Sequence, residues 1–161
     1  MDVRGRSVHS NATNKKIMKP IKDLNIVVGI CERDGRYLLL QRKDPNPMWD
    51  RKWEFPGGKI EIGEDSKDAI HREVLEETGL KVHQSKYFLH HTHDWDLEEK
   101  ILRVHIDCYH CLVGEGEMVT EEEKSYQIRW VTHEEALLLD SLKANNDILN
   151  TFFHEVLQNL G

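Results

Sequence analysis

Short blocks of apolar residues, separated by charged and turn-forming residues, run through most of this chain. Five of these blocks have the length and composition of strands, at 25–31, 36–41, 82–91, 102–113 and 127–131. The Asp34-Gly35 turn joins the first two into a hairpin, and an acidic turn at 94–99 joins the third and fourth. A proline-containing loop is expected at 43–52.

Three further stretches have helical features. Residues 65–78 contain no Pro or Gly and precede Gly79, which predicts a helix ending in a left-handed glycine. A capping box, Thr132-x-x-Glu135, predicts a second helix. A third follows from apolar residues at helical spacing, which form a core face: Ile148, Leu149, Phe152, Phe153, Val156, Leu157 and Leu160. This alternation predicts an α/β fold with a mixed β-sheet between α-helices.

The start of the chain differs from the rest. Its first twenty residues carry five Lys or Arg and a single Asp, with few periodic apolar residues. We predict a disordered basic arm at 1–22 and a single folded domain at 23–161. A nucleic-acid-binding arm, a targeting peptide and a passive tail are open interpretations of this arm.

Composition narrows the classes of function. With 39% apolar and 32% charged residues, the chain has the composition of a hydrophilic globular protein. A net charge of −7 disfavours nonspecific binding to duplex nucleic acid or an anionic membrane, and no apolar run is long enough to span a bilayer. Three cysteines are too few for a disulfide framework, so we expect a cytoplasmic protein.

The predicted helix at 65–78 carries an unusual set of charges. Glu73, Glu76 and Glu77 stand at i, i+3 and i+4, so their carboxylates share one face and repel one another. Oxygen donors without clustered Cys or His favour Mg²⁺ or Mn²⁺. Arg72, four residues before Glu76, can orient that carboxylate. Such a site suits metal-assisted attack of water on a phosphoanhydride, with one Glu taking the proton from water.

These residues resemble a known signature. The chain matches each fixed position of the Nudix box, the motif of hydrolases that split nucleoside diphosphates linked to another group: Gly58-x5-Glu64-x7-Arg72-Glu73-Val74-x-Glu76-Glu77-x-Gly79-Leu80. The segment before it, Trp53-Glu54-Phe55-Pro56-Gly57-Gly58, looks like the MutT branch, which removes oxidised guanine nucleotides. The likeness covers about 24–160. A solvated acidic surface helix is the alternative interpretation.

The resemblance implies roles for several residues. Glu73, Glu76 and Glu77 would hold the metal with help from the carbonyl of Gly57, and Arg72 would orient the carboxylates. Glu73 is the preferred general base, with Glu64 or an acid of a later loop as rivals. In that loop Glu123 is preferred over Glu121 and Glu122, and a solvated acidic turn is the alternative.

Base recognition would follow the same resemblance. Phe55 and Asn145 match positions that contact the purine, although Asn145 can instead cap a helix. The family pattern also has an Arg that contacts the purine, and this position falls on Lys43, with Arg42 beside it. The chain departs from the pattern here, because a Lys side chain lacks the planar guanidinium of Arg. Gly58 and Lys59 are also expected to contact the substrate, and Lys59 would contact a phosphate group.

Three smaller features lie outside the box. His90, His91 and His93, next to two aspartates, can bind a metal, contact substrate or serve as polar strand-end residues. Trp49 and Trp95 can stack on a base or pack. Cys108-x-x-Cys111 lies in a strand, where residues i and i+3 face opposite sides, so it predicts neither a redox nor a zinc site.

The combined prediction is a Mg²⁺-dependent pyrophosphohydrolase that acts on a small nucleotide. It would cleave a nucleoside triphosphate, 8-oxo-dGTP or another (d)NTP, to the monophosphate and pyrophosphate, as a monomer or homodimer. Two alternatives remain: a Nudix hydrolase of nucleotide sugars, dinucleoside polyphosphates or capped RNA, and a noncatalytic ligand sensor with the same fold. Specificity depends on loops outside the box.

Overall fold

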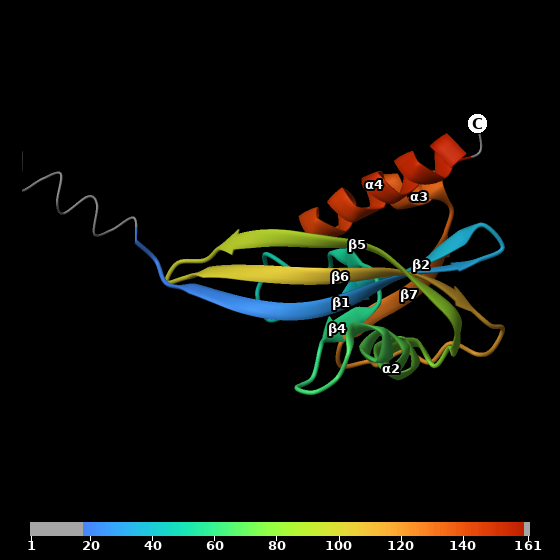
Figure 1. The fold of residues 1–161 in the computed structure, drawn as a ribbon, viewed down its shortest axis with the longest axis horizontal. Helices are drawn as coiled ribbons and strands as arrows, with labels where there is room; N and C mark the ends of the chain where they lie inside the picture. Colours follow the sequence, from blue (N-terminus) through green and yellow to red (C-terminus); the bar gives the residue numbers. More distant parts are fainter. Residues whose placement is uncertain (1–17, 160–161) are drawn as a thin grey trace, which may run out of the picture.

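A seven-stranded mixed sheet is the centre of the fold over residues 18–159, the part of the chain that the computed structural model describes (Figure 1). The strands follow one another along the chain as β1 (Ile21–Arg33), β2 (Arg36–Arg42), β3 (Trp53–Glu54), β4 (Gly57–Lys59), β5 (Val82–Asp96), β6 (Ile101–Val113) and β7 (Ser125–Val131). Their order in the sheet is β3-β2-β1-β6-β5, with β4 paired to β1 and β7 paired to β2. β1 and β6 run parallel, and the other pairs are antiparallel.

Helices cover both faces of this sheet. α2 (Ser66–Thr78) lies on one face, and α3 (His133–Leu138) and α4 (Lys143–Asn159) lie on the other (Figure 1). Each face has its own apolar core: α4 packs on residues such as Tyr37 and Ile106, whereas α2 packs on residues such as Val27 and Leu38. The predicted mixed sheet between helices is therefore confirmed.

Local signals set the limits of α2. The side chain of Asp65 caps its start by accepting a hydrogen bond from the backbone N–H of Asp68 at 2.8 Å. Gly79 ends it with a left-handed φ of 76° and donates its N–H to the carbonyl of Leu75. Ala69, Ile70 and Val74 are fully buried against the sheet, so this face of the helix is fixed toward the strands.

The other two helices also follow their sequence signals. The capping box of Thr132 and Glu135 is present at the start of α3. In α4, Ile148, Leu149, Phe152 and Phe153 are buried, so this part of the predicted apolar stripe is a core face. The side chain of Leu157 and the whole of Leu160, also predicted in the stripe, lie outside the described residues. The loop at 43–52 forms as predicted.

The limits of β1 and β5 differ most from those expected, and the short strands β3 and β4 were not predicted. The predicted turn at 94–99 is wrong, because residues 94–96 continue β5 and the connection lies at 97–100. Asp94 pairs there with Arg103 of β6 through two hydrogen bonds of 2.9 and 3.0 Å, so its charge is satisfied within a strand. β1 starts at Ile21, inside the segment predicted as an arm; most of that arm, residues 1–17, lies outside the described residues.

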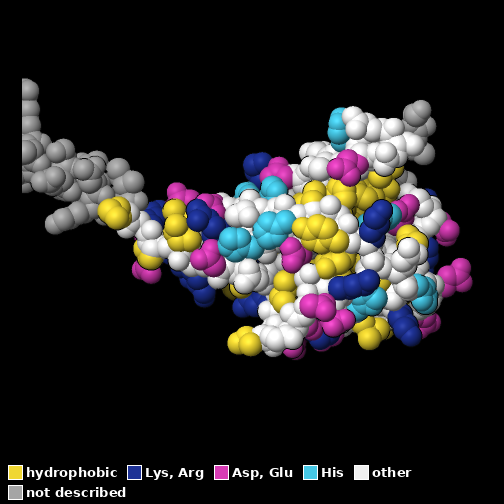
Figure 2. All heavy atoms as spheres, viewed as in Figure 1, with side chains coloured by type: hydrophobic (Ala, Val, Ile, Leu, Met, Phe, Trp, Pro, Cys, Tyr) yellow, Lys and Arg dark blue, Asp and Glu magenta, His cyan; other side chains and the backbone are white. Residues whose placement is uncertain are grey.

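The cysteines lie where strand alternation places them. Cys108 belongs to the core under α4, whereas Cys111 lies opposite Cys31 in the core under α2. All three are buried and free, so the Cys-x-x-Cys spacing does not bring two thiols together. Within residues 18–159, no helix has both the length and the apolar character needed to cross a membrane. Acidic and basic side chains are interspersed over the face shown in Figure 2.

Candidate active site

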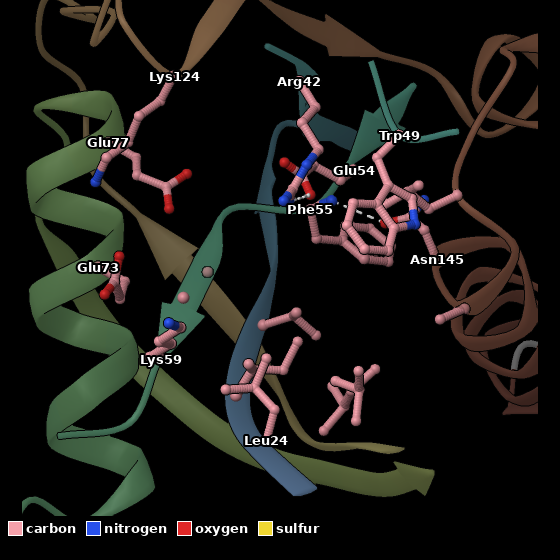
Figure 3. Close-up of a pocket in the computed structure, with 18 of the residues that line it drawn as sticks. Leu24, Arg42, Trp49, Glu54, Phe55, Lys59, Glu73, Glu77, Lys124 and Asn145 are labelled. Carbon is pink, nitrogen blue, oxygen red and sulfur yellow. Dashed lines mark hydrogen bonds and ion pairs between the residues drawn. The ribbon is translucent and has the colours of Figure 1, made fainter. Parts of the chain in front are cut away.

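One pocket of about 630 Å³ opens between the end of α2 and the start of α4 (Figure 3). Its floor consists of alternate apolar side chains of the parallel pair β1 and β6: Leu24, Ile26, Val28, Leu102, Val104 and Ile106. Alternation in a strand sends every second side chain to one face, which explains this regular floor. Glutamates of α2 lie at one end, and aromatic residues and Asn145 lie at the other (Figure 3).

Glu73 and Glu77 form the acidic end of the pocket. Glu73 is buried, with 7% of its surface exposed, although it is charged in water. A Cβ on Gly58 would lie 2.5 Å from its carboxyl carbon, so only glycine leaves room for this carboxylate against β4. Glu76 does not line the pocket, and about half of its side chain is exposed.

Arg72 links the carboxylates of the box. Its guanidinium donates to both oxygens of Glu64, from Nε at 2.8 Å and from Nη2 at 2.9 Å. Nη1 donates to Glu73 at 2.9 Å and to Glu76 at 3.2 Å, and Nη2 also reaches the carbonyl of Lys59 at 3.1 Å. A planar fork with five donors suits this set, whereas a lysine could not satisfy it.

The same contacts fix the charge of Glu64. Hydrogen bonds from Arg72, together with a backbone hydrogen bond from Glu61, lower the pKa of Glu64 to about 2. Glu64 is outside the pocket lining, and both of its oxygens are engaged. Glu64 is therefore placed to hold Arg72. The fold does not bring its carboxylate into the pocket, where a general base would act.

Glu77 has the opposite environment. Burial raises its pKa to about 9, and the nearby charges of Glu54 and Glu73 add to this shift. Such a carboxyl holds a proton at neutral pH as long as only other carboxylates surround it. A divalent cation would supply the missing positive charge, so the donor set fits Mg²⁺ or Mn²⁺.

The far end of the pocket is aromatic. Phe55 is buried, and Trp49 and Trp95 meet edge to face with ring centroids 5.6 Å apart. Both tryptophans line the pocket, so Trp49 of the loop at 43–52 and Trp95, which lies in β5, come together at one place. Flat apolar surfaces of this kind can stack against a nucleobase.

Asn145 joins this end of the pocket to the start of α4. Its Oδ1 accepts the backbone N–H of Phe55 at 2.8 Å, which fixes the orientation of the amide. The Nδ2 atom is buried and has no hydrogen-bond partner within residues 18–159. An amide can both donate and accept, but here Oδ1 accepts from Phe55 and only the Nδ2 donor is left for a ligand.

Arg42 and Lys43 both line the pocket, but their partners differ. Arg42 donates to Asp44 at 2.8 Å and to Glu54 at 3.2 Å. Lys43 instead donates to the backbone carbonyl of Glu122, at the edge of the pocket. Gly57 and Lys59, also expected at the site, belong to the lining as well.

Glu123 is a further expected site residue outside the lining of this pocket, in addition to Glu64, Arg72 and Glu76. It is exposed in the turn before β7, and the next two residues, Lys124 and Ser125, line the pocket. Nζ of Lys124 lies 3.7 Å from a carboxylate oxygen of Glu121. A role for Glu123 at the metal stays a prediction.

Sequence reasoning did not assign a role to Glu54 or Lys124. Glu54 lies in the pocket between Arg42 and the box carboxylates, and its burial raises its pKa. A charged residue inside the otherwise apolar run Trp53–Phe55 was a usable signal. Lys124 carried no such signal, because the pairing of β7 with β2 alone brings it to the pocket.

Comparison with known proteins gives a consistent result. The NUDIX domain model matches residues 23–152. The chain is 30% identical over 132 residues to a CTP pyrophosphohydrolase of Escherichia coli, covering 82% of this chain and 93% of that protein. It is 40% identical over 60 residues to an 8-oxo-dGTP diphosphatase of the same organism, but this match covers only 37% of the chain and 46% of that protein.

Solved structures share the same architecture. A MutT NUDIX hydrolase from Burkholderia pseudomallei superposes with a TM-score of 0.70 at 22% identity, covering 80% of this chain and 97% of that one. The solution structure of the E. coli ORF135 protein gives a TM-score of 0.60 at 28% identity, covering 83% and 91%.

Proposed function

Since this chain belongs to the Nudix family and is a Nudix phosphoanhydride hydrolase, we propose that its substrate is a nucleoside triphosphate. The products would be the nucleoside monophosphate and pyrophosphate, with Mg²⁺ as cofactor. One observation carries the proposal: a single pocket of about 630 Å³ has the box glutamates at one end and an aromatic surface with a buried amide donor at the other. Pockets of this size commonly enclose a small ligand.

The box residues would act on the phosphate end. Glu73 and Glu77, with Glu76 at the rim and the carbonyl of Gly57, would hold the metal. A bound divalent ion supplies positive charge to the phosphate oxygens and activates water. Glu73, buried and held by Arg72, is our choice for the group that takes the proton from water.

The aromatic end would hold the base. The free Nδ2 donor of Asn145 requires an acceptor atom on the base edge, which cytosine, guanine and 8-oxoguanine all carry. Phe55, Trp49 and Trp95 supply surfaces for stacking. The proposal of 8-oxo-dGTP or another (d)NTP stands, and the long alignment with a CTP pyrophosphohydrolase adds CTP to the substrates that need testing first.

A substrate panel tests this proposal. The protein would be incubated with Mg²⁺ and with 8-oxo-dGTP, dGTP, CTP, dCTP, a nucleotide sugar, a dinucleoside polyphosphate or capped RNA, in ¹⁸O-labelled water. Mass spectrometry of the products identifies both the leaving group and the phosphorus that water attacks. We expect pyrophosphate from at least one nucleoside triphosphate; cleavage of only the other substrates would refute the substrate class.

The noncatalytic sensor is the alternative from another class. A Glu73→Gln variant distinguishes it, because an enzyme loses turnover while a sensor retains ligand binding unchanged. A cytoplasmic location fits the three free cysteines, and assembly as a monomer or homodimer stays a prediction.

A further inference from the structure

A cluster of metal-binding side chains lies outside the acidic end of the pocket, where β5 passes under the start of α4. His91 and His93 are two residues apart in β5, so they point to the same face of the sheet. Asp147 comes from α4, which covers that face. One nitrogen of each imidazole and one oxygen of the carboxylate all lie within 4.8 Å of one another.

The cluster contains an atom that lacks a partner. Nε2 of His91 is buried and has no hydrogen-bond partner in the described part of the chain. Oδ2 of Asp147 lies 3.7 Å from it, which is too long for a hydrogen bond. An unpaired polar atom in a buried position is costly, and a metal ion between the nitrogen and the oxygen would satisfy both.

The distances suit a small cation. Ligands bound about 2.0–2.1 Å from a tetrahedral ion lie about 3.4 Å apart, so the 3.7 Å between His91 and Asp147 needs little adjustment. The imidazole rings of His91 and His93 already stand side by side, with centroids 6.4 Å apart and planes 18° from parallel. Two imidazoles and one carboxylate favour a transition metal over Mg²⁺.

We propose that His91, His93 and Asp147 form a binding site for a divalent transition metal of the Zn²⁺ type, separate from the magnesium site of the box glutamates. Three protein ligands leave the fourth tetrahedral position to water. The metal would join β5 to the first turns of α4. Asn145, two residues before Asp147, holds the backbone of Phe55, so the site would also fix the base end of the pocket.

One charge opposes binding at this place. Nζ of Lys143 donates to Oδ1 of Asp147 at 2.9 Å. The lysine side chain is 70% exposed, so it can leave the carboxylate without disturbing the core. Replacing this lysine by Gln is therefore expected to strengthen metal binding.

Titration of the full-length protein with Co²⁺, an optical probe for Zn²⁺ sites, tests the proposal. The protein must carry no affinity tag, since its own ten histidines already provide weak background sites. Mg²⁺ in excess would fill the box site. We expect one equivalent of Co²⁺ to give visible absorption bands that Zn²⁺ removes and Mg²⁺ does not, and Zn²⁺ to raise the melting temperature.

Two ligand variants and one control variant test the site. His91→Ala and Asp147→Asn should each abolish the stoichiometric Co²⁺ bands and the thermal shift with Zn²⁺. His90→Ala is the matched control, because His90 lies on the opposite face of β5 and pairs with Asp107 at 2.8 Å. Far-UV circular dichroism checks that each variant is folded. Absence of a saturable Co²⁺ band in the wild-type protein, or an unchanged band in folded His91→Ala, would overturn the site.

Discussion

At the scale of single residues, Arg72 determines the geometry of the box more than any other side chain described. It holds Glu64 with two hydrogen bonds and also reaches Glu73 and Glu76, so one guanidinium aligns carboxylates that would otherwise repel one another. The guanidinium stays charged at all working pH values, and its neighbours raise its pKa further. A lysine at this position would still attract the carboxylates, but its ammonium group could not align them.

Arg72→Lys is therefore expected to reduce kcat/KM by about 10–100-fold, the range typical for loss of a group that orients metal ligands. The Mg²⁺ concentration for half-maximal rate should rise as well. Steady-state kinetics over a Mg²⁺ series measures both. Lys52→Ala, which removes a surface ion pair with Asp140, is the control and should change neither value. An unaltered Mg²⁺ dependence in Arg72→Lys would contradict this role.

Glu77 leads to a prediction about stability and pH. Its pKa is about 9 in the folded protein and about 4.3 in an unfolded chain. Between these values the folded state binds the additional proton, so the free energy of unfolding of the metal-free protein falls as pH rises. Glu77→Gln removes this dependence and should stabilise the metal-free protein by about 1 kcal/mol or more at pH 8.

Urea unfolding with a chelator present, between about pH 5 and pH 9, measures this effect. Glu76→Gln is the matched control, because about half of the Glu76 side chain is exposed and it should leave the pH dependence unchanged. With Mg²⁺ in place of the chelator, the order should reverse, since the wild-type protein gains binding energy that Glu77→Gln loses. Parallel pH profiles for wild type and Glu77→Gln would show that Glu77 titrates normally.

At the scale of elements, α2 and the glycine strand β4 form the acidic end of the pocket together. Local spacing was enough to predict α2, because its cap, its stop and its glutamates lie within fifteen residues of sequence. The contact with β4 could not be predicted from spacing, since it depends on the pairing of Gly57 and Gly58 with β1. The end of β5 could not be predicted from spacing either. A turn was expected there, but the acidic end of the strand pairs with Arg103.

Two glycine substitutions in β4 distinguish an effect on the position of Glu73 from an effect on the stability of the protein. In Gly58→Ala the new methyl would meet the carboxylate of Glu73, a flexible end that can move aside. We expect a folded protein with a melting temperature close to wild type but at least about tenfold lower kcat/KM. In Gly57→Ala the methyl would overlap the backbone carbonyl oxygen of Val27, so the β1–β4 pairing should be lost and the protein destabilised.

Differential scanning calorimetry and steady-state kinetics on the two variants check this contrast. Full activity in Gly58→Ala would mean that the position of Glu73 does not matter for turnover.

At the scale of the whole molecule, the pocket combines segments that are far apart in sequence. The floor comes from β1 and β6, the acids from α2, and the aromatic end, where we propose that the base binds, from the loop at 43–52, β5 and α4. The sequence identified Phe55 and Asn145 through the family pattern, but the meeting of Trp49 with Trp95 depends on the tertiary fold alone. The chemistry of the box is thus local, whereas specificity is a property of the assembled sheet and α4.

Asn145 allows a direct test of that specificity. Asn145→Asp keeps the oxygen that accepts from Phe55 and replaces the free Nδ2 donor by a second acceptor, so the fold should persist while the contact to the base is lost. We expect KM for the best nucleoside triphosphate to rise about 10–100-fold, since an unpaired buried acceptor costs about 1–3 kcal/mol, with a smaller change in kcat.

Asn146→Asp makes the same change one position away on α4, at a residue that does not line the pocket, and should leave KM near its wild-type value. The comparison therefore cancels the general effect of an added charge on α4 and isolates the donor itself. Equal KM values for Asn145→Asp and Asn146→Asp would place the base outside this end of the pocket. In that case substrate selection would depend on the phosphate end alone, where every nucleoside triphosphate presents the same groups, and the enzyme should accept the four bases equally.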